Sequence, residues 1–169
     1  MPRDKLLFLA RFFASAIVLF LLWFFVRDAY ISVVGRISVW LSSIFSLGKL
    51  EYLVTHSGEL FVRSYAMRAD FSVSANPVVA NIIPFWALLV ASKNIHWNKK
   101  LKDALLGFGI LLLFHIVALS VIILFVEGGS TTLEGIKVFI DALLLAFLPF
   151  FLWIFFAGRE EISFDRMFE

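Results

Sequence analysis

The sequence predicts a mainly α-helical, polytopic membrane protein with four transmembrane helices and a small extracytoplasmic module made of an amphipathic helix and a β-hairpin. Composition is the first observation: 62% of the 169 residues are hydrophobic, and the mean hydropathy is +0.95. A soluble core of this size cannot hide so much apolar surface from water. The spacing of the apolar runs is the second. A bilayer takes about 20 apolar residues per helix, so we expect one membrane domain over 1–169 whose spans lie at about 6–26, 78–92, 103–126 and 136–157.

The first span follows two basic residues, Arg3 and Lys5, which is also how a secretory signal begins. Its apolar stretch is too long for a signal, and no cleavage site of small residues follows closely. We therefore expect an uncleaved anchor.

Residues 27–77 form a more polar insert, which we expect to be extracytoplasmic. Its first part, 30–47, is apolar but has Arg36 near its middle and recurring serines at 32, 38, 42, 43 and 46, which favours a membrane-surface helix. A crossing by this segment remains the alternative. Residues 49–74 then contain short runs rich in β-branched and aromatic residues, separated at Ser57-Gly58 and at Ala69-Asp70. This pattern predicts two or three strands in a small hairpin.

The second span continues from Asn76-Pro77 and contains Pro84, which removes a backbone donor and predicts a kinked helix, with Asn81 near the outer boundary. The loop 93–102 carries four lysines, whereas the turn 127–135 carries no basic residue. Since basic loops stay in the cytoplasm, we expect both termini on that side. The insert holds five basic residues, but the rule weakens for long folded segments.

Two ionisable residues lie within predicted spans: His115 near the centre of the third, and Asp141 in the fourth. Such groups are costly in lipid and should face the bundle, a cavity or a partner. Antiparallel packing of these spans would bring the two to similar depths, where they could form a proton relay or an acid–base pair. Alternatively, His115 makes a helix–helix hydrogen bond and Asp141 pairs with Lys137 one turn away.

Several chemistries are excluded or lack a motif. The chain has no cysteine, so it forms no disulfide, thiolate metal site or cysteine nucleophile. Its formal charge is only +2, with basic residues scattered among apolar runs, which disfavours nucleic acid as a partner. No Ser-His-Asp set, phosphate loop or metal cluster is present in the sequence. We therefore predict no catalytic, cofactor-binding or metal residues, no cofactor, and no enzymatic activity.

The order of features resembles the exosortase H-associated membrane proteins of bacteria. The similarity lies in the anchor, the strand segment ending in NPVVANIIPFWALLVAS, the basic loop leading into LKDALLGFGILLLFHIVALS, and the last span LLLAFLPFFLWI. It is most specific at Asn76-Pro77, Pro84, Ala87-Leu88, Gly107 and Pro149–Trp153. The exosortases themselves use Cys, Arg and His, and this chain lacks the cysteine and any arginine in spans 2 to 4, so no catalytic residue is carried over.

The resemblance implies an accessory role in a bacterial inner membrane, with a protein-sorting enzyme or its substrate as the partner and the lipid bilayer as surroundings. Two alternatives remain. One is an oligomeric transporter or permeation subunit for ions or small solutes, with Pro84, His115 and Asp141 lining a path. The other is a structural subunit of a different membrane complex. An enzyme working through His115 is the least favoured reading.

Overall fold

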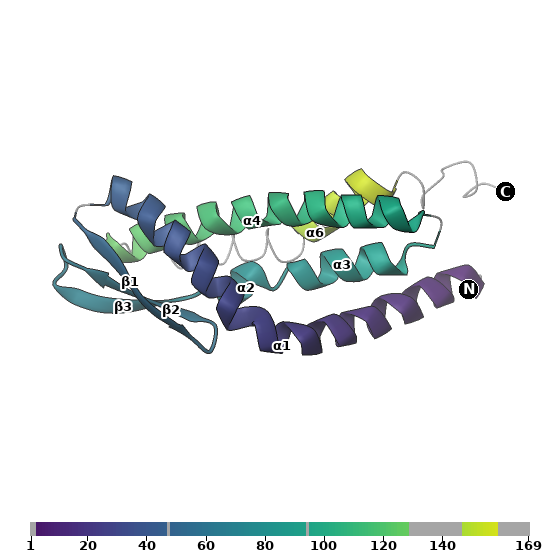
Figure 1. Cartoon of the computed structure of the whole chain (residues 1–169), viewed down its shortest axis with the longest axis horizontal. Coiled ribbons are helices and arrows are strands. Elements are labelled where there is room, and N and C mark those ends of the chain that lie inside the picture. Colours follow the sequence, from purple (N-terminus) through teal and green to yellow (C-terminus); the bar gives the residue numbers. More distant parts are fainter. Residues whose placement is uncertain (1–2, 47, 94, 129–146, 159–169) are drawn as a thin grey trace.

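The computed structural model describes residues 3–46, 48–93, 95–128 and 147–158. The fold is mostly helical and elongated, with a small sheet at one end (Figure 1). Two long helices run side by side in the same direction, and short helices pack between and beside them (Figure 1). The helices are α1 (Arg3–Phe45), α2 (Asn76–Val79), α3 (Ile82–Ala91), α4 (Trp97–Glu127) and α6 (Leu148–Trp153), the last followed by a π-helical turn (Ile154–Gly158). The strands are β1 (Leu50–His56), β2 (Glu59–Ser64) and β3 (Ala69–Ser74).

Helix α1 is continuous over 43 residues, so the predicted boundary between an anchor at 6–26 and a separate helix at 30–47 is not observed. The stretch contains no proline, and its one glycine, Gly35, does not interrupt it. Gly35 instead allows the sheet to pack closely against α1, because a Cβ atom there would lie 2.5 Å from Leu60 Cδ1. The helix bends near its middle, and its second half crosses beside the sheet (Figure 1).

The predicted strands are confirmed as a three-stranded antiparallel sheet in the order β1-β2-β3. The second predicted break, at Ala69-Asp70, is wrong, because these residues begin β3 and the turn lies at 65–68, where Arg68 has a positive φ of 53°. The first turn falls at the predicted break: Ser57 and Gly58 both have positive φ, of 52° and 84°, as a two-residue hairpin turn with mirror-image geometry requires. One face of the sheet is apolar and buried, with Leu60, Val62 and Val73 packed in the core.

The second predicted span is divided into two short helices, α2 and α3, with Ala80 and Asn81 between them. Pro84 lies in the first turn of α3. A proline ring clashes with the carbonyl group four residues earlier in a helix, which here belongs to Ala80, so the interruption lies where Pro84 requires it. Among the described residues, two helices, α1 and α4, are long and apolar enough to cross a membrane. Residues 136–146, half of the predicted span at 136–157, lie outside the described residues.

Helices α3 and α4 approach closely at Gly107, where a Cβ atom would lie 2.1 Å from Cζ of the buried Phe85 ring. At the same end of the molecule, Trp153 Nε1 donates a hydrogen bond to Ser92 Oγ at 2.9 Å. The ammonium group of Lys100 donates to the carbonyl groups of Val90 and Ser92. These contacts satisfy the carbonyl end of α3.

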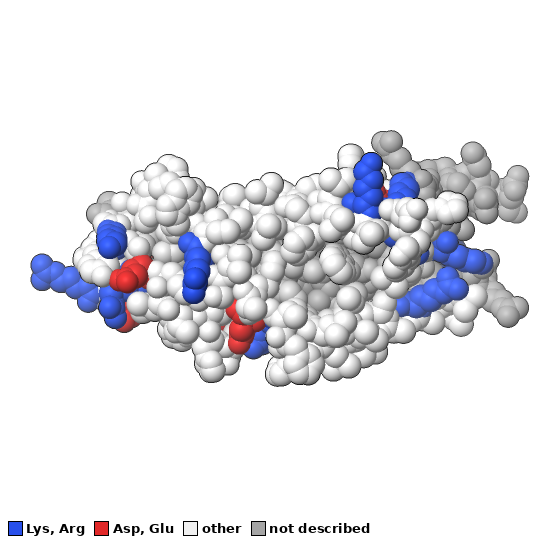
Figure 2. All heavy atoms as spheres, viewed as in Figure 1, with Lys and Arg blue, Asp and Glu red and all other residues white. Residues whose placement is uncertain are grey.

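Exposed hydrophobic side chains form a belt around the half of the molecule away from the sheet. We call this the apolar belt, and it comprises the exposed residues of α1 from Leu6 to Val26, of α4 from Leu101 to Val117, and of the stretch from Phe147 to Phe155. On the face shown in Figure 2, lysines and arginines lie at both ends of the molecule, and acidic side chains lie mainly over the sheet half. Largely uncharged surface separates the charged side chains at the two ends (Figure 2).

Candidate functional site

A buried polar network joins three helical segments at the edge of the apolar belt. His115 of α4 lies between Tyr30 of α1 and Asn81 at the α2–α3 interruption, and both His115 and Asn81 are completely buried. The Tyr30 hydroxyl is 2.8 Å from His115 Nδ1, and His115 Nε2 is 2.7 Å from Asn81 Oδ1. Since an amide oxygen only accepts, Nε2 carries the proton and donates to Asn81, while Nδ1 accepts from the Tyr30 hydroxyl.

This arrangement satisfies both ring nitrogens of a neutral imidazole without water. The rings of Tyr30 and His115 also meet edge to face, with centroids 5.9 Å apart and planes at 90°. A side chain that is buried and bonded on both sides cannot reach a substrate without rearrangement. The geometry therefore suits a connection that fixes the relative positions of α1, α3 and α4.

The structure thus gives the candidate residues different surroundings. His115 contacts Tyr30 and Asn81, Pro84 lies three residues beyond Asn81, and Asp141 lies outside the described residues. Sequence reasoning did not assign Tyr30 or Asn81 as partners of His115. Asn81 carried a signal, because an amide beside a proline in an apolar run needs a buried partner; nothing near Tyr30 indicated its role.

Hydrogen bonds from serines hold the second half of α1 against α4, so these serines do not form a polar outer face. Ser38 Oγ donates to the Ile116 carbonyl at 3.1 Å, Ser42 Oγ to the Ser120 carbonyl at 3.1 Å, and Ser120 Oγ to the Ser38 carbonyl at 3.2 Å. Ser38 and Ser42 are fully buried and four residues apart, the spacing of small residues that lets two helices approach closely. Two of the recurring serines that suggested a membrane-surface helix, Ser38 and Ser42, therefore form a helix–helix contact.

The exposed side of this half is apolar. Val33, Ile37, Trp40 and Ile44 recur every three or four residues and are each at least 40% exposed. Their spacing places them on one face of the helix. The buried side of this segment carries Ile31, Val34 and Val39 beside the serines, so apolar residues lie on both sides and the predicted division into a polar and an apolar face is not observed.

The first turn of the sheet is attached to α1 through Asp28. Its carboxylate accepts hydrogen bonds from the backbone N–H groups of Ser57 at 3.2 Å and Gly58 at 3.0 Å, and it also pairs with Arg27 at 2.9 Å. Further along, Ser32 and Tyr52 are joined through their hydroxyl oxygens at 2.8 Å. These bonds fix the sheet to the helix that leads into it.

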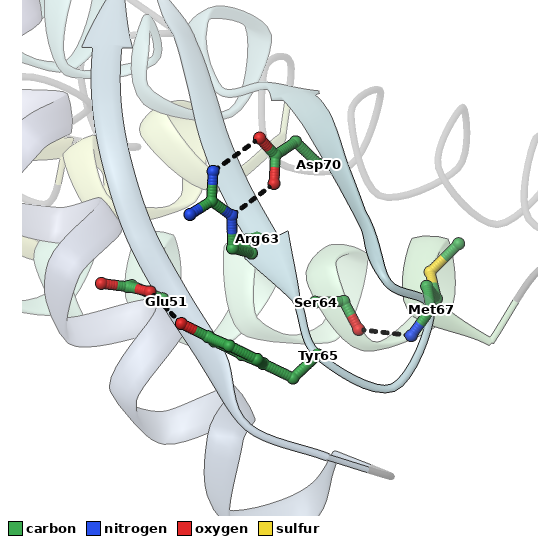
Figure 3. A network of polar contacts seen from close by, with 6 residues as sticks. All are labelled: Glu51, Arg63, Ser64, Tyr65, Met67 and Asp70. Carbon is green, nitrogen blue, oxygen red and sulfur yellow. Dashed lines mark hydrogen bonds and ion pairs between the residues drawn. The ribbon is translucent and has the colours of Figure 1, made fainter.

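The opposite end of the sheet is attached to α4. Ser64 Oγ donates to the buried Glu127 carboxylate at 2.8 Å and accepts from the Met67 N–H at 3.2 Å (Figure 3). The sheet therefore has contacts with both long helices.

Outward from that contact, the sheet carries an exposed charged face. Arg63 and Asp70 pair across β2 and β3 with two hydrogen bonds, of 2.8 and 3.1 Å, and the Tyr65 hydroxyl donates to Glu51 at 2.7 Å (Figure 3). The Arg63 guanidinium holds the pKa of the Asp70 carboxyl below its ordinary value, and Glu51 raises the pKa of Tyr65. This face is polar and well solvated.

Strand β3 is one of the two edges of the sheet, β1 being the other, and within the described residues no strand pairs with the outer side of β3. The residue pairs that close the two turns determine which backbone groups of β3 point away from β2. His56 pairs with Glu59 and Ser64 with Ala69, so the alternation of an antiparallel ladder directs the N–H and C=O groups of Asp70, Ser72 and Ser74 away from β2. Such an edge is a template for an added strand.

Among the described residues, no group of three or more His, Asp or Glu side chains is placed to hold a metal ion. No family model, no curated protein and no solved structure matches this chain.

Proposed function

We propose that the protein is a non-enzymatic membrane protein that presents the edge strand β3 to a protein partner at the outer surface of a bacterial inner membrane. The observation that carries this proposal is the outward row of backbone groups on β3, on a sheet fixed at both ends to long apolar helices. A rigidly held edge can pair with an extended segment of another chain, since main-chain hydrogen bonds give affinity with little demand on sequence.

The apolar belt supports the placement in the bilayer. From Leu6 to Val26, α1 rises about 30 Å at 1.5 Å per residue, which matches the hydrocarbon thickness of a typical bilayer. The predicted loop 93–102 is in part helical, since α4 begins at Trp97, and this basic segment lies at the end of the molecule away from the sheet (Figure 1). In the proposed orientation this loop and both termini are cytoplasmic, the sheet is outside, and α1, α2–α3, α4 and the C-terminal apolar stretch make four crossings.

The resemblance to exosortase H-associated membrane proteins supplies the class of partner. We assign this role as an accessory to a membrane protein-sorting enzyme, with β3 contacting the enzyme or an extended segment of its substrate. A transporter is less supported, because His115 is fully buried with both ring nitrogens engaged by protein side chains.

The test is a proline at the outward-facing position Ser72, whose side chain is exposed. Ser72→Pro removes an outward N–H and leaves the ladder to β2 intact, as prolines on natural edge strands do. We expect it to lower co-purification of the cross-linked partner at least about fivefold, while the matched control Ser72→Ala retains it. Full recovery of the partner with a folded Ser72→Pro chain would reject the edge as the binding element.

A further inference from the structure

A groove lies on the inner side of the α1 bend, where this helix diverges from α3 and α4. Its volume is about 630 Å³, within the range of about 300–1,000 Å³ of small-molecule sites. Its walls include Leu22, Val26 and Ala29 of α1, Trp86 of α3 and Phe108 of α4. All twelve lining residues are apolar or aromatic, and the one hydroxyl among them, that of Tyr30, is already bonded to His115.

We infer that this groove binds one acyl chain of a phosphate-bearing bilayer lipid. The inference rests on the membrane placement proposed above, and it adds a ligand that the partner-binding role does not require.

The length of the groove suits a hydrocarbon chain. The α1 wall extends from Leu19 to Val33, about 21 Å at 1.5 Å per residue. A single hydrocarbon chain is thin and flexible enough to lie along it.

The opening of the groove favours lipid over water. Leu22, Val26 and Val33 are each more than half exposed at its rim, and the first two belong to the apolar belt. Besides the Tyr30 hydroxyl, the polar side-chain groups of the lining are the indole N–H groups of Trp23 and Trp86, of which the Trp86 N–H is buried without a hydrogen-bond partner among the described residues. The space therefore offers few partners with which to hold water. In a bilayer, neighbouring acyl chains reach it directly from the side.

Charge places the headgroup. Arg27 follows Val26 on α1, at the end of the belt. Its side chain is 17% exposed, with Nε paired to Asp28 at 2.9 Å and the guanidinium carbon 5.6 Å from the centre of the Phe24 ring. Among the described contacts no hydrogen bond involves its two terminal nitrogens, which can donate to a phosphate. A chain lying along the groove would bring its headgroup to this level.

The experiment uses the full chain, reconstituted in vesicles of phosphatidylglycerol and phosphatidylethanolamine and released into mild detergent for native mass spectrometry. We expect the wild type to retain one phospholipid, with a preference for phosphatidylglycerol. Ala29→Phe places a ring in the groove from an exposed position and should lower retention about tenfold, equivalent to one interaction of moderate strength. Arg27→Gln should weaken the preference for the anionic lipid.

Ala14→Phe is the matched control, since Ala14 is exposed on the same helix and does not line the groove; it should bind lipid as the wild type does. Val33→Trp is a second blocking variant if Ala29→Phe fails to fold. Retention undiminished in both blocking variants, or absent in the wild type, overturns the inference.

A third outcome overturns it as well: cross-linking of a cysteine at position 29 to a second protein chain would show that a protein fills the groove. The two proposals fail separately. A chain that washes off membranes at high pH contradicts the membrane placement, whereas a chain that stays in the membrane without a retained lipid contradicts the groove alone.

Discussion

Replacing His115 with phenylalanine tests whether the buried network is a structural connection or a chemical site. The substitution keeps a ring of similar size but removes both hydrogen bonds. Asn81 is completely buried, and leaving its carbonyl oxygen without this donor costs about 1–3 kcal/mol. Tyr30 is only partly buried and can turn its hydroxyl elsewhere, at a cost of about 1 kcal/mol. We expect His115→Phe to lower the free energy of unfolding by about 2–3 kcal/mol.

A double-mutant cycle isolates the interaction. Asn81→Leu alone should also destabilise the protein, because it leaves the His115 Nε2–H unpaired. In the double variant both polar groups are gone, so the loss should be smaller than the sum of the single losses by at least about 1 kcal/mol. Interhelical hydrogen bonds in membrane proteins average about 0.6 kcal/mol and reach about 1.7 kcal/mol, so the coupling expected here lies above the average. The assay is denaturant unfolding in a mild mixed micelle, followed by near-ultraviolet circular dichroism.

The same variants separate structure from chemistry. If His115 is a structural connection, His115→Phe should still co-purify with the partner at a temperature where the variant is folded. Additive losses, within about 0.3–0.5 kcal/mol, would show that the two side chains do not stabilise each other. Loss of co-purification with the partner, at unchanged stability of the variant, would refute the structural role of His115 and would restore the hypothesis of a role in proton transfer.

Three further outcomes follow from particular contacts. Gly107→Ala should destabilise the protein by about 1–3 kcal/mol, because the buried ring beside it must move. Gly109→Ala, with no atom within 4 Å of the new Cβ, should be neutral or raise stability by up to about 1 kcal/mol. Thermal unfolding in detergent compares the two variants. Ser42→Leu should overfill the contact between the long helices and lower the melting temperature, while Ser43→Leu, whose hydroxyl bonds only within its own helix, should leave it near the wild-type value. Because the pKa of Asp70 is lowered in the folded state, its pair contributes stability above the ordinary pKa of 3.8 and loses it as the pH falls through the folded value. The small difference in melting temperature between wild type and Asp70→Asn should therefore be constant from pH 5 to 8 and vanish in stronger acid.

Local sequence signals were sufficient for the strands and the first turn, whereas the second turn lies at 65–68 and not at the predicted Ala69-Asp70. The strands followed from runs of β-branched and aromatic residues, and the Ser57-Gly58 break is the observed turn. These features depend on neighbours in the sequence, where periodicity and turn chemistry are informative. The apolar lengths of the first and third spans likewise sufficed to identify the two long helices.

Long-range contacts could not be predicted in the same way. Periodicity placed the serines of 30–47 on one face but could not tell whether water or another helix covers that face. The small-residue spacing of Ser38 and Ser42 was the available signal for helix contact. His115 was identified as costly in lipid, yet its partners lie 85 and 34 residues away along the chain. The four-crossing arrangement remains a proposal, because the described residues contain two helices of sufficient length.

The serine contacts between the two long helices have a consequence for biogenesis. Ser42 and the carbonyl group that it binds are 78 residues apart, and at translation rates of about 5–20 residues per second the second helix is completed about 4–16 s after the first. In the proposed orientation, the second half of α1 would reach the outer side during that interval without the helix that covers Ser38 and Ser42 in the folded protein. Truncated chains ending before residue 116 would leave this face uncovered and should be rapidly degraded by membrane proteases.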